Sequence, residues 1–295
     1  MPPEYKYNFL PKKELLSVEE IERIVKTFAK LGVKKVRLTG GEPTLREDLE
    51  EIIRRISRIE GIKDIALTTN GYLIEDRLKS LKEAGLKRIT FSIHSLNPEI
   101  NEKIVNRKVD ISKVLKAVDE AKALGLKVKV NSVIVRGLNE SEILPLAEYF
   151  KKKKITLRFI EFMDVGTLNG WDYDKVVPAE EILNIIKTKY EVVELGREER
   201  DTALRFKYAD DGVEFGLIAS VTKPFCRGCN RIRLSADGKV YTCLFSSEGH
   251  NIRDEERLEE RIKEIWRSRE DRYSELRKLL REERSRKVEM FKVGG

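Results

Sequence analysis

Apolar residues along this chain follow two periods that alternate from one segment to the next. Stretches with apolar positions three and four residues apart predict amphipathic helices, and shorter runs rich in Val, Ile, Leu and Phe predict strands. Ser17 and Glu20 form a capping-box pattern before the first helical stretch. Five strand-then-helix units result, with strands expected over 33–40, 62–70, 87–95, 126–135 and 155–163.

This alternation predicts a parallel sheet with right-handed crossover helices. Five such units followed by a different pattern favour a partial (β/α) barrel over a closed eight-stranded one. A doubly wound open sheet is the alternative architecture. In either case ligands bind at the carboxyl ends of the strands. Those ends are polar here, so we expect a large site there; the polar segments are 39–42, 68–71, 92–95, Asn131 and 161–164.

The pattern changes after about residue 200. The runs 213–220 and 230–245 predict antiparallel strands, and Asp237-Gly238 inside the second run is a hairpin-turn signal. Two charged helices are expected to follow, over 254–269 and 271–287.

Composition narrows the class of protein. Charged residues make up 37% and hydrophobic residues 40% of the 295 positions, which is typical of a soluble globular protein. The net charge of +8 suggests an anionic partner, although Lys and Glu alternating along helices account for much of it as solvated faces. No apolar run has the length that spans a bilayer, and the first residues lack the apolar region of a signal peptide. A cytoplasmic location is therefore expected.

The three cysteines are clustered near the C-terminal end, at Cys226, Cys229 and Cys243. A CxxC turn places two thiols on one side, and the hairpin predicted between Cys229 and Cys243 brings the third beside them. Three thiolates suit an iron–sulfur cluster with one iron free of protein ligands, and they equally suit zinc with His250 as a fourth ligand. Spacing alone leaves both open.

Basic residues stand where a dry core would not tolerate them. Arg231 and Arg233 share one face of a predicted strand next to the cysteines, which suits an anionic ligand, unless they are ordinary surface charges. Lys35, Arg37, Lys129 and Arg158 lie inside predicted parallel strands, so they line a wet cavity or pair with acids. The Gly40-Gly41-Glu42 turn matches neither a phosphate loop nor a dinucleotide loop.

These motifs form an ordered set that resembles one family. The chain resembles the GTP 3′,8-cyclases, the radical S-adenosylmethionine (SAM) enzymes that begin molybdopterin synthesis. The landmarks run from FLPKKELLS through KKVRLTGGEPTLR, LTTNG, KVKVNSVIVRGLN, RFIEFMDVG, FCRGCNRIRLSADGKVYTCLF and WRSREDRY to the final VGG.

The resemblance implies a fold and a division of the chain. We expect a partial TIM-type barrel of the radical SAM type, missing its first strand, over residues 1–195. Residues 196–295 are expected to form a C-terminal region of antiparallel strands and helices that carries a second [4Fe–4S] cluster and binds GTP.

The resemblance also implies site residues. It assigns the second cluster to Cys226, Cys229 and Cys243, and so chooses iron–sulfur over zinc. Positions matching GTP contacts are Arg37, Thr68, Lys129, Arg231 and Arg233, with Lys35 and Arg158 as further basic lining. Positions matching SAM contacts are Gly41, Ser92 and Met163, with Glu42 near the methionine amino group. The tail residues Gly294 and Gly295 are expected to reach into the site.

The chemistry implied is a radical cyclisation. A first, reduced [4Fe–4S] cluster cleaves SAM, the 5′-deoxyadenosyl radical takes hydrogen from ribose C3′ of GTP, and C3′ joins guanine C8 to give (8S)-3′,8-cyclo-7,8-dihydroguanosine 5′-triphosphate. The implied partners are flavodoxin or ferredoxin as electron donor, the downstream cyclic pyranopterin monophosphate synthase, and a possible second copy of the chain. Neither nucleic acid nor a membrane is implied.

The sequence departs from the family at one place. The first cluster requires a CxxxCxxC motif, and no cysteine precedes Cys226. The expectation is therefore that the chain starts at an internal methionine, and that as printed it binds one cluster without generating the radical. Two alternatives stay open: a non-catalytic protein that binds GTP or a partner through one metal site, and a zinc-binding nucleic-acid module.

Overall fold

A computed structural model of the chain describes residues 10–105, 108–166, 169–198, 201–280 and 288–293. The main sheet has eight strands in the order β1-β2-β3-β4-β5-β8-β7-β6. The strands are β1 (Lys35–Leu38), β2 (Asp64–Thr69), β3 (Arg88–Ser92), β4 (Lys127–Ile134), β5 (Thr156–Glu161), β6 (Val192–Gly196), β7 (Leu204–Tyr208) and β8 (Glu214–Ile218).

Strands β1 to β5 are parallel and adjacent in chain order, which confirms the partial barrel. In a doubly wound sheet the strand order reverses at a switch point, whereas the order of β1 to β5 runs in one direction without a reversal. The strand predicted over 213–220 is β8, which is antiparallel to β7 as expected and in addition pairs in parallel with β5, which was not predicted. Two successive chain reversals, β6 to β7 and β7 to β8, turn β8 back into the direction of β5.

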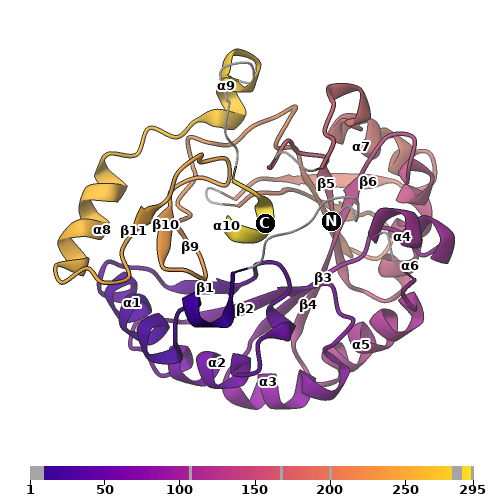
Figure 1. Ribbon diagram of the computed structural model, residues 1–295. Coiled ribbons are helices and arrows are strands. Elements are labelled where there is room, and N and C mark those ends of the chain that lie inside the picture. The colour runs from indigo at the N-terminus through magenta and orange to yellow at the C-terminus, as the bar shows by residue number, and fades with distance from the viewer. Residues whose placement is uncertain (1–9, 106–107, 167–168, 199–200, 281–287, 294–295) are drawn as a thin grey trace.

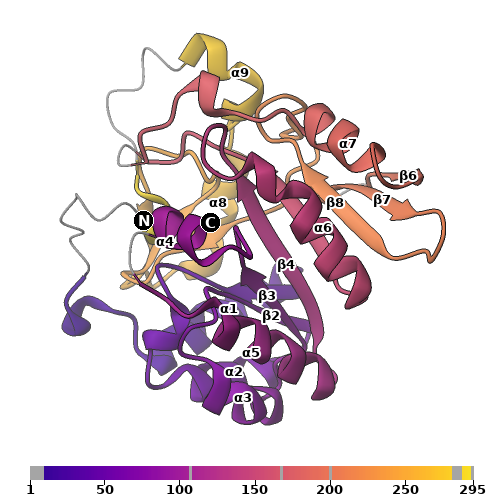
Figure 2. The same ribbon diagram turned by 90° about the vertical axis from the view of Figure 1, so that its right-hand side faces the viewer.

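Helices surround the strands (Figure 1). They are α1 (Val18–Lys30), α2 (Leu49–Ser57), α3 (Leu78–Ala84), α4 (Pro98–Val105), α5 (Ile111–Ala123), α6 (Ile143–Lys152) and α7 (Ala179–Lys187). Short 3-10 turns are η1 (Lys12–Glu14), η2 (Pro43–Leu45), η3 (Glu75–Arg77), η4 (Glu140–Glu142) and η5 (Tyr173–Lys175). Figure 2 shows β8, β7 and β6 continuing the wall on the side of α6 and α7.

Local sequence signals set the helix ends. The predicted capping box opens α1, where the Ser17 hydroxyl accepts from the Glu20 amide at 3.1 Å and the Glu20 carboxylate accepts from the Ser17 amide at 2.6 Å. Helix α3 ends at Gly85, whose φ is +118°, and a Cβ there would lie 2.6 Å from the Ser57 Cβ. Only glycine meets both the backbone angle and the close approach of α2.

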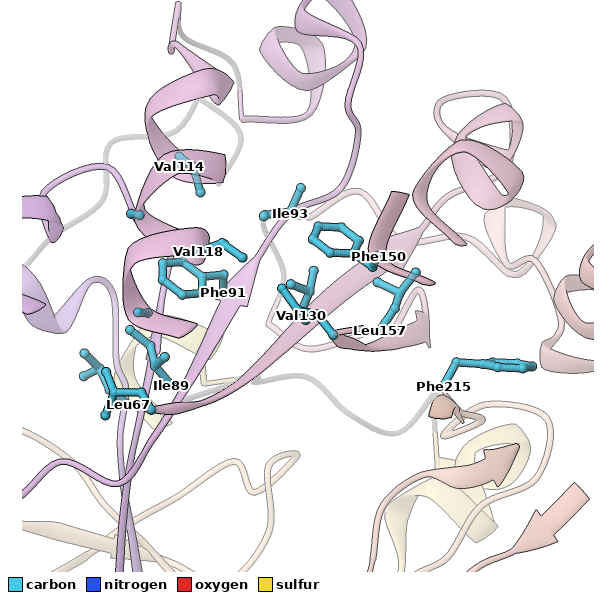
Figure 3. Packing of buried hydrophobic residues seen from close by; sticks show 14 of the residues in the cluster. Leu67, Ile89, Phe91, Ile93, Val114, Val118, Val130, Phe150, Leu157 and Phe215 are labelled. Carbon is cyan, nitrogen blue, oxygen red and sulfur yellow. The ribbon is translucent and has the colours of Figure 1, made fainter. Parts of the chain in front are cut away.

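The outward faces of the strands form the core. Leu67, Ile89, Phe91, Val130 and Leu157 alternate along their strands and pack against the helices (Figure 3). All five are at most 2% exposed. Because side chains alternate across a sheet, the intervening residues point into the barrel.

The C-terminal region adds a three-stranded antiparallel sheet and three helices. These are β9 (Arg233–Leu234), β10 (Lys239–Tyr241), β11 (His250–Asn251), α8 (Leu258–Arg267), α9 (Tyr273–Leu280) and α10 (Met290–Val293). The hairpin signal is confirmed, since Gly238 has a φ of +84° and the Ser235 amide bonds to the Lys239 carbonyl at 2.8 Å. The remainder of the helix predicted over 271–287 lies outside the described residues.

This region packs back onto the first helix of the barrel. Ile24 and Phe28 of α1 share an apolar cluster with Val240, Leu258 and Ile262, and α8 lies beside α1 in Figure 1. The C-terminal segment thus covers the side of the barrel next to β1, while the division at residue 195 stays a prediction. Within the described ranges no helix combines the length and hydropathy of a membrane span.

Candidate active site in the barrel interior

A cavity of about 2270 Å³ fills the interior of the barrel. The inward residues of β1 to β5 and β8 form one wall, and the segment containing the cysteines forms the opposite wall. Typical ligand pockets measure about 300–1,000 Å³. The space is therefore large enough for more than one ligand.

Arg37 crosses the interior face of β2. Its guanidinium donates to the hydroxyl of Thr68 at 2.7 Å and to that of Thr90 at 3.4 Å. Burial lowers the pKa of Arg37, and the positive charge of Arg88 lowers it further. The side chain is surrounded by protein yet reached by solvent through the cavity, so its charge is retained and available to an anion.

Lys129 and Arg158 add two cations to the same interior. Arg158 donates from Nε to the Asn131 side-chain oxygen at 2.9 Å. Burial, together with the charges of Arg37 and Arg88, lowers the pKa of Arg158 to about 10. Burial also lowers the pKa of Lys129. The lowered pKa values mean that burial and mutual repulsion disfavour the charged forms of these side chains, and a bound anion would favour the charged forms again.

Two further residues predicted from the resemblance lie near these cations. Thr68 and Lys35 both line the cavity, and Lys35 stands opposite Asp64 in the strand register. Arg88, which the sequence analysis did not single out, is a further cation of the interior. The sequence did contain a signal for Arg88, because it is the first residue of β3 and lies on the same strand face as Thr90 and Ser92.

The cysteine segment faces this basic interior. The Cys229 amide bonds to the Cys226 carbonyl at 3.0 Å, which closes the CxxC turn. Cys243 follows β10, as the hairpin predicted, and its amide donates to the Ser246 hydroxyl at 3.2 Å. All three thiols are free, and all three residues line the cavity.

Charge around the cysteines is also positive. Burial raises the pKa of Cys229, but the guanidinium of Arg231, its amide and the guanidinium of Arg269 outweigh burial and bring it below its usual range. Burial raises the pKa of Cys243. Burial lowers the pKa of Arg233, which lies near both Cys229 and Cys243. Arg231 stacks over Phe225, with its guanidinium carbon 5.5 Å from the ring centre. The predicted pair Arg231 and Arg233 therefore does adjoin the thiols.

The residues around the three cysteines distinguish a zinc site from an iron–sulfur cluster. Across the described ranges no group of three or more His, Cys, Asp or Glu residues is close enough to hold a single metal ion. His250 lies exposed on β11, so the zinc site of three cysteines and His250 is not formed. A [4Fe–4S] cluster binds each thiolate at a separate iron, so it needs three free thiols facing one space, which these are. The cysteines fit the cluster in kind, and its ligation stays a prediction.

The residues expected to contact SAM are partly gathered. Gly41, Glu42 and Met163 line the cavity, whereas Ser92 pairs in register with Asn131 and is not part of the lining. The Glu42 carboxylate already accepts hydrogen bonds from the Thr69 hydroxyl at 2.7 Å and, among others, from backbone amides. If Glu42 binds the amino group of SAM as predicted, its carboxylate must accept that hydrogen bond in addition to the ones it already accepts within the protein.

The chain's last described residues enter the same cavity. Glu289 and Lys292 line it, and α10 lies at the centre of the barrel view in Figure 1. A Cβ on Gly166 would lie 2.2 Å from a Glu289 carboxylate oxygen, so the tail passes directly over that glycine. Gly294 and Gly295, predicted to reach into the site, lie outside the described residues.

Sequence reasoning missed a buried ion pair that holds α9. Arg277 donates from Nε to the Asp164 carboxylate at 2.9 Å, and the two side chains are 5% and 0% exposed. Tyr273 donates its hydroxyl to the same carboxylate. Asp164 directly follows Met163, so this pair fixes the loop after β5 against the C-terminal helix. Nothing in the local sequence linked positions so far apart.

His94 is a structural residue in this fold. Its Nδ1 accepts from the Val133 amide at 3.1 Å, and burial lowers its pKa to about 4. The neutral ring thus joins β3 to β4.

Comparison with known proteins defines the class first. The Radical SAM superfamily model matches residues 3–150, and the Molybdenum Cofactor Synthesis C model matches residues 155–275. Among solved structures, Streptococcus suis SuiB bound to S-adenosylmethionine aligns with a TM-score of 0.61 at 14% identity, covering 85% of this chain and 58% of that one. Native anSMEcpe with bound AdoMet aligns with a TM-score of 0.58 at 19% identity, covering 88% and 76%. The barrel is therefore of the radical SAM type.

Curated relatives then narrow the class to a family. The chain is 65% identical over 295 residues to the GTP 3′,8-cyclase of Aquifex aeolicus (strain VF5), which covers 100% of this chain and 91% of the relative. It is 44% identical over 298 residues to the GTP 3′,8-cyclase of Staphylococcus aureus (strain JH9), and this alignment covers 97% of this chain and 88% of the relative. The chain belongs to the GTP 3′,8-cyclase family.

Proposed function

We propose that this protein acts in the first step of molybdenum cofactor biosynthesis, the SAM-dependent cyclisation of GTP to (8S)-3′,8-cyclo-7,8-dihydroguanosine 5′-triphosphate. The observation that carries the proposal is one cavity with two basic groups in a chain 65% identical to a GTP 3′,8-cyclase. One group lies on the barrel strands and the other beside the cysteines.

The strand cations bind the triphosphate in this proposal. Arg37, Lys129 and Arg158 converge on the interior, and Lys35 and Thr68 complete the lining. Guanidinium groups match phosphate oxygens in bidentate geometry, which orients the nucleotide as well as attracting it.

The cysteine segment receives the guanine end. Cys226, Cys229 and Cys243 would hold a [4Fe–4S] cluster with one iron open to the base, and Arg231 and Arg233 would hold the nucleotide against it. Gly41, Ser92, Met163 and Glu42 would contact SAM, and the tail ending in Gly294 and Gly295 would lie over the substrate. The first cluster of the family, bound by a CxxxCxxC motif, would supply together with SAM the radical that removes hydrogen from ribose C3′. These 295 residues contain no such motif.

The protein's own part is orientation and exclusion. The basic interior would hold ribose and base in one conformation between the two groups of cations, with C3′ close to C8 of the same nucleotide. With substrate bound, the strands and the cysteine segment would displace water from around the reactive carbon. A flavodoxin or ferredoxin donor, the downstream synthase and a homodimer stay predictions.

The test has a binding arm and a catalytic arm. Anaerobic reconstitution of the chain should give about four iron and four sulfide per protein, with GTP binding in equilibrium titration. Replacing Cys243 with Ser should reduce the iron content. Fusing a CxxxCxxC segment from a family member to the chain should then yield the cyclised triphosphate, detected by mass spectrometry. GTP binding without product from the fusion would support the non-catalytic alternative, and no GTP binding would reject the proposal.

A further inference from the structure

Arg88 carries a charge in the cavity for which the sites above assign no ligand. It lines the cavity, and its side chain is 27% exposed. Its guanidinium holds Asp64 of the neighbouring strand through two contacts, Nε to Oδ1 at 2.9 Å and Nη2 to Oδ2 at 2.5 Å. This two-point pairing fixes the plane of the guanidinium and uses only part of its five N–H donors.

Strand register places Arg88 in the row of inward residues furthest from the carboxyl end of β3; this row is called the floor of the site, and the carboxyl ends of the strands are its mouth. Arg37, Ala66 and Arg88 are cross-strand neighbours in one row. Lys129 lies one row nearer the carboxyl ends, beside Thr90. Arg158 lies one row further, beside Asn131. Successive rows on one face are about 7 Å apart, so the cations descend from mouth to floor.

Arg37 and Arg88 both line the cavity at this row. Ala66, which is itself buried, stands between them in the register. Arg37 reaches across it to the Thr90 hydroxyl, two residues from Arg88 on the same strand face. An anion bonded to Arg37 therefore lies within the span of the Arg88 side chain.

The positive charge at this point exceeds what the nearby acids neutralise. Asp64 pairs with Arg88, and Glu214 pairs with Arg205. Asp201 offsets only part of the positive charge around Lys129 and Arg158, whose pKa values stay lowered. The charge of Arg88 contributes to the lowered pKa of Arg37, of Lys129 and of Arg158. Arg88 is thus a common neighbour of the three cations proposed to bind phosphate.

We propose that Arg88, oriented by Asp64, is a further substrate-binding residue that contacts the terminal phosphates and makes the site select a nucleoside triphosphate over a monophosphate. This inference rests on the proposed function, since it assumes that GTP enters with its phosphates toward the strands. In that orientation the α-phosphate is bound by Arg158 and Lys129 and the two further phosphates of GTP approach Arg88, whereas GMP lacks these two phosphates.

The test compares GTP, GMP and inorganic triphosphate in equilibrium titrations of the anaerobically reconstituted chain. Arg88→Met should weaken GTP and inorganic triphosphate by about ten- to a hundredfold and leave GMP within about twofold, because a charge-assisted contact is lost only for the longer ligands. Arg88→Lys should restore part of the loss for GTP, since it returns the charge without the planar donor group.

Two matched variants separate a contact from a change in net charge. Lys127→Met removes one positive charge from the position next to Arg88 in the register, but Lys127 is outside the cavity lining. It should leave the ratio of GTP to GMP affinity unchanged. Arg88→Met with Asp64→Asn removes both charges of the pair, keeps the net charge, and replaces Arg88→Met if that variant does not fold. It should lower the ratio as Arg88→Met does.

The outcomes distinguish the two proposals. If the unsubstituted chain binds GTP and Arg88→Met keeps its ratio of GTP to GMP affinity, the role of Arg88 is overturned and the proposed function stands. The same holds if Lys127→Met lowers the ratio equally. If the unsubstituted chain binds neither GTP nor inorganic triphosphate, both proposals fall.

Discussion

The two faces of the barrel strands carry opposite chemistry within the same few residues. On β3, Ile89 and Phe91 are fully buried against helices, while the alternating residues Arg88 and Thr90 face the interior. The outer face holds the fold by excluding water from apolar side chains. The cations gathered on the inner face repel one another and so lower the stability of the ligand-free protein. Binding of an anion restores that stability. In each strand, therefore, alternate residues serve different purposes: one set stabilises the fold and the other lines the binding cavity.

The largest effect is expected from breaking the outer face. Phe91→Ala should lower the free energy of unfolding by about 3–5 kcal/mol, because a fully buried ring leaves a cavity. GTP affinity of the folded fraction should not change. Urea denaturation and titration measure the two quantities, and Phe91→Leu serves as the milder control. A large loss of affinity in Phe91→Leu at full folding would contradict the separation of the faces.

A titratable group in the segment just after β3, His94, should respond to acid. Burial lowers the pKa of His94 to about 4 from an ordinary 6.5. Below pH 6.5 the unfolded chain takes up a proton that the folded chain refuses, so the free energy of unfolding should fall by up to about 3 kcal/mol as the pH drops toward 4. His94→Gln should show a smaller fall over that range in urea titrations at several pH values. Parallel pH courses for both proteins would refute this origin.

Breaking the inner face should have the opposite signature. Lys129→Met should weaken GTP binding by about ten- to a hundredfold through loss of a charged contact. The ligand-free chain should not lose stability and should gain slightly, because Arg158 and Arg88 no longer repel a neighbouring charge. Calorimetric titration and thermal unfolding without ligand test both parts. A clear loss of stability would mean that Lys129 serves the fold.

The smallest effect is expected at the cysteine segment. Arg231→Ala or Arg233→Ala should weaken GTP binding by about tenfold, because each leaves the other guanidinium in place. Iron and sulfide content should stay at the level of the unsubstituted chain, since neither residue supplies a ligand. Equilibrium titration and metal analysis provide the two readings, and unchanged affinity would remove these arginines from the site.

Much of the barrel could be predicted from local patterns. The alternation that buries Phe91 and exposes Arg88 is a property of any strand, and the glycine after α3 marks a backbone angle that other residues avoid. The CxxC turn and the hairpin before Cys243 are likewise short-range features, so the gathering of three thiols at one cavity could be anticipated. Arg88 was overlooked because a charge at the start of a strand is usually solvated.

Contacts between distant segments could not be predicted in this way. The parallel pairing of β8 with β5, the Asp164–Arg277 ion pair and the packing of α8 on α1 each join residues far apart in the chain. Short-range patterns fix which face of a segment is apolar, but not which other apolar face will cover it.

By itself the sequence determined the order of strands and helices, the two-sided character of the strands and the chemistry of the side chains at their carboxyl ends. Those properties depend on backbone sterics and alternation within a few residues, which no distant contact reverses. The tertiary structure alone decided that the strand cations and the cysteine segment share one cavity, because closing the chain over more than a hundred residues depends on the summed packing of the whole core.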